Sequence, residues 1–266
     1  MKKVIYKFFR INQYLFDTLI SNQLYFSSIQ QFNDPYDSRM TFLSRIDEED
    51  FKVYLKNTIE SEEIRLKYLN AFKKNPDEFI KPFIDLYESM LNYFGICCFT
   101  NDKDDLLLWS HYADGHKGVC LGFDYDLMTK KFPQFDEVDY NDDPFHFDIK
   151  NATKSVSNTI LRKSTKWKYE GEIRFLMERS KRAAFYLDAL AEVNFGSKCK
   201  PRDMLNIQYL VTKLGYKNCQ FYKAGVNKKE FKIDFEKSNL SELKDSVLNE
   251  SKAIPFKGKI DLKHLL

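Results

Sequence analysis

Residues 94–123 read FGICCFTNDKDDLLLWSHYADGHKGVCLGF, two apolar runs separated by an acidic turn and a helix-like segment. The runs Phe94–Thr100 and Gly118–Phe123 predict buried strands, because short apolar runs bounded by turn residues are typical of strands inside a sheet. Between them, Asp104–Tyr112 predicts a helix capped by its acidic start, and Asp114-Gly115 predicts the turn into the second strand. This stretch therefore predicts strand, helix and strand in close succession.

The same alternation continues on both sides of this stretch. Upstream, Val4–Phe9 predicts a strand, residues 14–20 predict a helix with Asn12 as its N-cap, and Leu24–Ser27 predicts a second strand. Downstream, the patterns predict strands over 137–140, 172–177, 218–223 and 230–235, with helices over 155–162 and 201–213. Strands outnumber helices, which favours an α+β fold with a mixed, mostly antiparallel sheet in a single domain over residues 1–266.

Residues 47–91 differ from the rest, because they are charged and nearly free of glycine. Their apolar spacing predicts two or three amphipathic helices, broken near Asn75-Pro76 and Lys81-Pro82. We interpret this segment as a helical insertion. It either packs on the domain or forms a lid or a partner surface.

Composition narrows the class of protein. The chain has 43% hydrophobic and 30% charged residues and a net charge of +3, which excludes a disordered or membrane-spanning chain and does not by itself indicate nucleic-acid binding. Five cysteines without a CxxC pair favour free thiols in a reducing compartment. The N-terminal apolar run ends at Lys7, so no signal peptide is predicted. We expect a cytoplasmic protein with no membrane partner.

Two blocks of polar residues are candidates for function. In Phe32–Asp37, the side chains of Asn33, Asp34 and Asp37 could bind a cation or a ribose, or merely stabilise the turn before Pro35. In Trp109–Phe123, Trp109 and Tyr112 share one helix face and either line a pocket or pack in the core. His111 and His116 could titrate near neutral pH, although a surface role is the simpler interpretation.

The third block is KWKYEGEIRF, residues 166–175. In an extended segment Glu170 and Glu172 would face the same side, and two adjacent carboxylates can raise one pKa and form an acid/base pair. Arg174 continues on that face and could instead neutralise Glu172 in a structural ion pair. The chain has no GxGxxG, P-loop, HExxH or GxSxG motif, so other common catalytic patterns are absent.

Together, FNDPYD, WSHYADGHKGVCLGF and EGEIR resemble an uncharacterised bacterial and prophage family that shares FNDPxD, WxxYAxxHxGxCLGF and a late ExExR. The order of elements also resembles, more distantly, the ADP-ribosyltransferase fold. That fold has a basic residue on its first strand, Tyr or Ser on a middle element and Glu on a late strand. This chain lacks a first-strand histidine and a serine–threonine–serine run.

The resemblance implies an enzyme that uses NAD as its substrate and modifies a macromolecule, as a toxin or an anti-phage defence effector. It implies Glu172 as the catalytic residue with Glu170 beside it, and Lys7 or Arg10 on the first strand. The middle position falls either on Tyr25, Ser27 and Ser28 or on Phe99-Thr100. Asn33, Asp34, Trp109 and Tyr112 complete the expected NAD site.

The implied partners are an antitoxin and a protein or nucleic-acid acceptor. Two rival functions stay open at this point. One is a metal-dependent nuclease or phosphodiesterase using Asp34, Asp37, His111 and Glu172. The other is a non-catalytic nucleotide-binding module.

Overall fold

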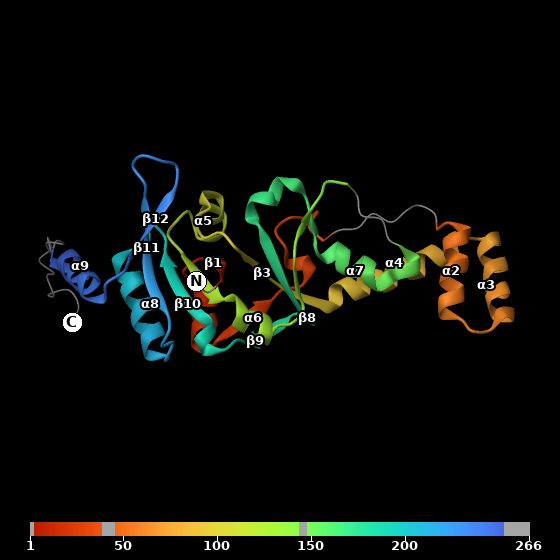
Figure 1. Cartoon of the computed structure of the whole chain (residues 1–266), viewed down its shortest axis with the longest axis horizontal. Coiled ribbons are helices and arrows are strands. Elements are labelled where there is room, and N and C mark those ends of the chain that lie inside the picture. Colours follow the sequence, from red (N-terminus) through yellow and green to blue (C-terminus); the bar gives the residue numbers. More distant parts are fainter. Residues whose placement is uncertain (1–2, 39–45, 144–147, 253–266) are drawn as a thin grey trace, which may run out of the picture. The chain divides into compact units, whose positions relative to one another are not determined.

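The computed structural model describes residues 3–38, 46–143 and 148–252, and these residues form two compact units (Figure 1). Of the described residues, unit 1 comprises those within 1–7, 21–103 and 124–189, and unit 2 comprises those within 8–20, 104–123 and 190–266. The segments of the two units interleave along the chain, so no single cut in the sequence separates them.

The strands of unit 1 belong mainly to an antiparallel sheet. Its strand order is β1 (Val4–Phe9), β3 (Phe94–Thr100), β8 (Glu172–Glu178) and β5 (Phe135–Glu137), and each neighbouring pair is antiparallel. Two short pairs accompany it: β2 (Gln23–Phe26) with β9 (Lys181–Ala184), antiparallel, and β6 (Asp139–Tyr140) with β7 (Arg162–Lys163), parallel. Strand β8 has a partner on each side and is buried over its first four residues.

The helical segment of unit 1 contains α2 (Glu48–Thr58), α3 (Glu62–Lys74) and α4 (Asp77–Tyr93), three helices where the pattern predicts two or three. Figure 1 shows α2 and α3 lying side by side. The rings of Phe51 on α2 and Phe72 on α3 stack with their centroids 4.3 Å apart. The predicted break at Asn75-Pro76 is confirmed. The predicted break at Lys81-Pro82 is wrong, because Pro82 lies inside α4.

Helix α4 tolerates Pro82 because its later turns are held by packing. Tyr87 and Leu91 are buried with Val156 and Ile160 of α7 (Ala152–Ile160). The Tyr87 hydroxyl also donates to Thr159 Oγ1 at 2.6 Å. Unit 1 further contains α6 (Tyr125–Lys131) and four 3₁₀ helices, η1 (Ile29–Gln31), η2 (Ile149–Asn151), η3 (Thr165–Glu170) and η4 (Leu187–Ala189).

Unit 2 has strands in the order β4 (Val119–Asp124), β10 (Leu190–Phe195), β11 (Gln220–Val226) and β12 (Ile233–Lys237). Strands β10 and β11 are parallel and are joined through α8 (Pro201–Lys213), whereas the other two pairs are antiparallel. Helices α1 (Gln13–Ser21), α5 (Leu106–Tyr112) and α9 (Leu240–Lys252) complete it. The fully buried Trp109 of α5 packs edge-on against Phe8 at 5.1 Å.

The prediction of a mixed α+β fold with mostly antiparallel strands is confirmed. The bounds of β1, β3 and α8 agree with the sequence patterns, and the Asn12 side chain accepts a hydrogen bond from Tyr14 N at 3.0 Å, as expected of the N-cap. The stretch predicted as one strand over 137–140 is divided between β5 and β6. Strands β7, β9 and β10 and helices α6 and α9 were not predicted, and Arg162, predicted at the end of a helix, lies in β7.

Candidate functional site

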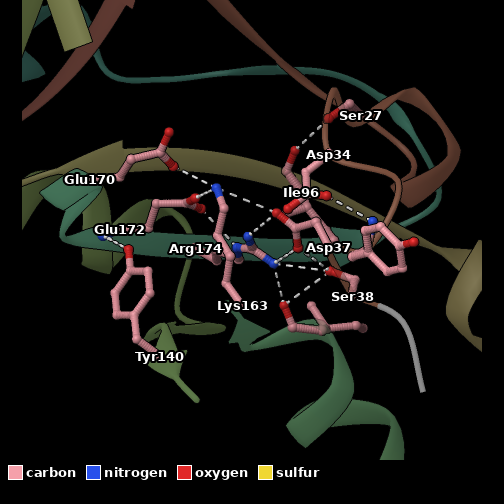
Figure 2. A network of polar contacts seen from close by, with 12 residues as sticks. Ser27, Asp34, Asp37, Ser38, Ile96, Tyr140, Lys163, Glu170, Glu172 and Arg174 are labelled. Carbon is pink, nitrogen blue, oxygen red and sulfur yellow. Dashed lines mark hydrogen bonds and ion pairs between the residues drawn. The ribbon is translucent and has the colours of Figure 1, made fainter. Parts of the chain in front are cut away.

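A buried cluster of charged side chains occupies the start of β8 in unit 1 (Figure 2). Arg174 is its centre and is fully buried. Its Nη1 and Nη2 donate to Oδ1 and Oδ2 of Asp37 at 2.9 and 2.7 Å, and its Nε donates to Glu172 Oε2 at 2.8 Å. The guanidinium also donates to Ser38 Oγ and to the Ile160 carbonyl. A bidentate pair of this kind fixes both partners in orientation, because guanidinium and carboxylate are planar and complementary.

Lys163 of β7 is the second cation of the cluster. Its ammonium group binds Glu170 at 2.5 Å, pairs with Glu172 Oε1 and lies 3.5 Å from Asp37 Oδ2. Figure 2 shows the amine among these three carboxylates. The cluster thus contains three carboxyl groups and two cations, and all five residues are at most 6% exposed.

The two glutamates reach Lys163 through a turn rather than along one strand. Glu170 ends the 3₁₀ helix η3, Gly171 adopts the left-handed conformation with φ of 49°, and Glu172 begins β8. Glycine adopts this conformation most readily, because it has no Cβ to clash. The expectation that Glu170 and Glu172 share the face of one extended segment is therefore wrong, although their side chains do converge.

Charge pairing controls protonation in this cluster. Burial by itself would raise the pKa of Glu172, but the Arg174 guanidinium, with a further contribution from the Lys163 ammonium, holds it well below its usual range. The neighbouring carboxylates Glu172, Glu170 and Asp37 outweigh the burial of Lys163 and raise its pKa. The pKa raised in the expected acid/base pair is therefore not that of Glu172, and the alternative ion pair between Arg174 and Glu172 is present.

Glu172 also lies in a row that crosses three strands of the unit 1 sheet. Tyr6 of β1 is opposite Thr100 of β3, and Thr100 is opposite Glu172 of β8. Directly opposed residues of antiparallel strands present their side chains on the same face, with Cβ atoms about 5 Å apart. The row therefore connects the first strand of the chain to the late acidic strand through a hydroxyl-bearing residue.

The comparison with known families supports the resemblance to an uncharacterised family. Residues 108–175 match the profile of a family described as a protein of unknown function (DUF2971). This match covers Lys163, Glu170, Glu172 and Arg174 but not Asp37. No significant match is found among curated proteins or among solved structures.

Lys7 is separated from the charged cluster by the strand itself. Its neighbour Tyr6 shares the face of Glu172, and successive strand residues point to opposite faces. In agreement with this, Lys7 Nζ lies over the Phe99 ring at 5.7 Å and donates to the Cys98 carbonyl at 3.0 Å. The expected placement of Lys7 with Glu172 is wrong, and Tyr6 takes the first-strand position in the row.

The other unit 1 residues predicted for the NAD site have local partners. The Tyr25 hydroxyl lies within hydrogen-bond distance of Gln31 and Ser180, and Ser27 Oγ donates to the Ile96 carbonyl at 3.2 Å. Asp34 Oδ1 accepts from Tyr36 N at 2.8 Å, which is the turn-stabilising alternative. Asn33 is exposed beside it. Figure 2 shows Ser27 and Asp34 near the cluster. Their predicted role in binding NAD stays a prediction.

The remaining predicted residues belong to unit 2. Arg10 is exposed, Tyr112 is half-buried and lies near the His111 ring, and Trp109 is fully buried. Trp109 stacks on His116 at 6.1 Å, and burial lowers the pKa of His116, with a smaller contribution from Lys198. These contacts give Trp109 the core role that its sequence context allowed.

Sequence reasoning missed Lys163, Ser38 and Tyr140, whose hydroxyl accepts from Glu172 N at 2.9 Å. None of these three residues belongs to a recognisable sequence motif. The family match over residues 108–175 is the one signal that includes Lys163. Within the described ranges, no three His, Cys, Asp or Glu side chains are arranged to hold a metal ion, and no helix is long and apolar enough to cross a membrane.

Proposed function

We propose that this protein cleaves the bond between nicotinamide and ribose in NAD and transfers ADP-ribose to a macromolecule, with Glu172 as the catalytic residue. The observation behind this proposal is the row Tyr6–Thr100–Glu172. Thr100 and Glu172 lie on one sheet face as the middle hydroxyl and the late glutamate of the ADP-ribosyltransferase resemblance, with Tyr6 on the first strand where that resemblance implies a basic residue. Of the two candidates for the middle position, this geometry favours Thr100.

The protonation state of Glu172 suits this reaction. Cleavage of the glycosidic bond passes through an oxocarbenium-like species, which a fixed carboxylate stabilises. The lowered pKa keeps Glu172 ionised at neutral pH, and the cluster has one more carboxyl group than cations. Burial strengthens the interaction, because fewer water molecules screen the charge.

Lys163 and Arg174 act as positioning residues in this proposal. Each binds a different oxygen of Glu172, so the carboxylate is held in one orientation. Lys163 also pairs with Glu170, and Arg174 also pairs with Asp37. Because each cation shares its charge with a second carboxylate, it neutralises Glu172 only in part. The Glu172 side chain is 7% exposed, so the substrate reaches it only when the covering residues are displaced.

The test is the consumption of labelled NAD by the purified protein, alone and with cell lysate. We expect free nicotinamide and label on a macromolecule, and we expect Glu172→Gln to reduce the rate about a hundredfold or more, the scale of losing one transition-state charge contact. Glu178→Gln is the matched control, because Glu178 ends the same strand and is exposed. Thermal unfolding of both variants separates lost chemistry from lost folding.

Absence of NAD cleavage by the folded wild-type protein in both settings would end this proposal. Saturable stabilisation by NAD without turnover would instead indicate the nucleotide-binding module. The proposed role as a toxin or defence effector is tested in cells. Expression of the wild-type chain should arrest growth and expression of Glu172→Gln should not, while co-purification from such cells would reveal an antitoxin.

A further inference from the structure

The loop between β11 and β12 of unit 2 presents an apolar ring to solvent. Phe231 is 102% exposed and Val226, at the end of β11, is 74% exposed. Figure 1 shows this loop at the end of the blue β11–β12 hairpin. Most phenylalanines of a folded chain are buried, so a ring that touches almost nothing is unusual.

Hydrogen bonds within the loop hold it in one conformation. Asn227 Oδ1 accepts from Lys229 N at 2.7 Å and from Glu230 N at 2.9 Å, and Asn227 Nδ2 donates to Asp234 at 2.8 Å. Backbone bonds join Asn227 to Lys232 and Lys232 to Glu230. The ring is thus displayed on a preorganised turn, which lowers the conformational entropy lost on binding.

Positive charge surrounds this ring. Lys228, Lys229 and Lys232 are exposed beside it, and Lys232 pairs with the acid Glu230 at 2.7 Å, which leaves Lys228 and Lys229 as the excess positive charge. The excess extends through the segment 190–237, which has ten Lys and Arg residues and five Asp and Glu residues, a net of +5. The whole chain has a net charge of +3, so the rest of it is net negative. An anionic partner is therefore favoured at this part of unit 2.

We propose that the β11–β12 loop binds single-stranded nucleic acid, with Phe231 stacking on a base and Lys228 and Lys229 contacting phosphates. An exposed aromatic ring among basic side chains is the combination that such proteins use, because every base offers a π-face. A lipid surface fits less well. Charged residues flank Phe231 on both sides, so insertion of the ring would draw Glu230 and Lys232 into the bilayer interface.

The experiment uses the full chain in the Glu172→Gln form without NAD, so that its result does not depend on the proposed enzymatic function. Fluorescence anisotropy with labelled oligo(dT) and oligo(U) should show salt-dependent binding. Phe231→Ala should weaken the affinity about fivefold or more, the effect of removing one base stack. Replacing Lys228 and Lys229 with glutamine should lower the salt slope by about 1.4.

Two variants serve as matched controls in unit 2. Tyr14→Ala removes another aromatic ring, 69% exposed on α1, and Lys217→Gln removes an exposed lysine outside the loop; neither should change the affinity. Equal affinities for wild type and Phe231→Ala, or no binding at low salt, would overturn the proposal. Binding of phosphatidylserine vesicles that depends on Phe231, with no binding of either oligonucleotide, would assign the loop to membranes instead.

Discussion

The Arg174 guanidinium binds both carboxylate oxygens of Asp37, although 137 positions separate the two residues in the chain. This pair attaches the FNDPYD turn to β8 inside unit 1. Buried ion pairs offset a large desolvation cost only when every charge keeps its partners. The integrity of the whole cluster should therefore depend on each cation.

Arg174→Met should destabilise the protein by about 3–5 kcal/mol, because Asp37 and Glu172 would each lose a buried partner. Urea denaturation measures the change. Lys150→Met is the control, since its pair with Asp50 is exposed and should contribute little. A midpoint for Arg174→Met close to that of Lys150→Met would show that the cluster does not hold the fold.

Stability should depend on pH at both ends of the scale. The folded pKa of Glu172 is lowered, so its contribution is present above the unfolded value of about 4.3 and is lost as the pH falls further. The folded pKa of Lys163 is raised, so its contribution is complete below about 10.4 and is lost at higher pH. Burial also raises the pKa of Tyr140 to about 12, which adds to the alkaline loss.

Urea denaturation across this range should therefore show a plateau between about pH 5 and 10 with a fall on either side. The acid fall should be smaller in Glu172→Gln, which has no carboxyl group to protonate at that position. An equally steep acid fall in this variant would mean that other carboxylates control acid unfolding.

Pro82→Ala should stabilise the protein by about 1–2 kcal/mol. Proline lacks the N–H that would bond to the Glu78 carbonyl, and it costs about 3 kcal/mol in a helix interior. Part of this cost is offset because proline also lowers the conformational entropy of the unfolded chain, so the alanine variant gains less than the full amount. Pro76→Ala at the N-cap of α4 is the control and should have a smaller effect. A loss of stability in Pro82→Ala would show that α4 is stabilised by the proline at this position.

The sequence patterns predicted local structure better than the site. Short apolar runs such as Phe94–Thr100 specify a strand by themselves, and a side-chain cap such as Asn12 specifies a helix start. Pro82 misled the prediction because burial of Tyr87 and Leu91 compensates for the lost hydrogen bond. Propensity is a weak guide wherever tertiary packing opposes it.

The charged cluster could be predicted only in part, because its residues come from distant positions in the chain. The motifs contained Asp37, Glu170, Glu172 and Arg174, but their partnership depends on long-range pairing that local spacing does not encode. Because Glu170 and Glu172 are two residues apart, the pattern predicted that both lie on one face of a strand. In the structure the left-handed Gly171 divides them, so that Glu170 ends η3 and Glu172 begins β8. Lys163, which joins all three carboxylates, belongs to no motif.

The final prediction concerns Thr100, the middle residue of the cross-strand row Tyr6–Thr100–Glu172. Its hydroxyl faces the same side as Glu172 and accepts a hydrogen bond from Asp102 N at 3.0 Å, which leaves its own proton available for a ligand oxygen. Thr100→Val keeps the shape and removes that donor. If NAD is the substrate, kcat should fall about a hundredfold with a smaller change in KM, because the bond strengthens in the transition state. Thr58→Val, at an exposed hydroxyl on α2, should leave both constants unchanged. Equal kcat values for Thr100→Val and wild type would remove Thr100 from the middle position and return it to Tyr25, Ser27 and Ser28.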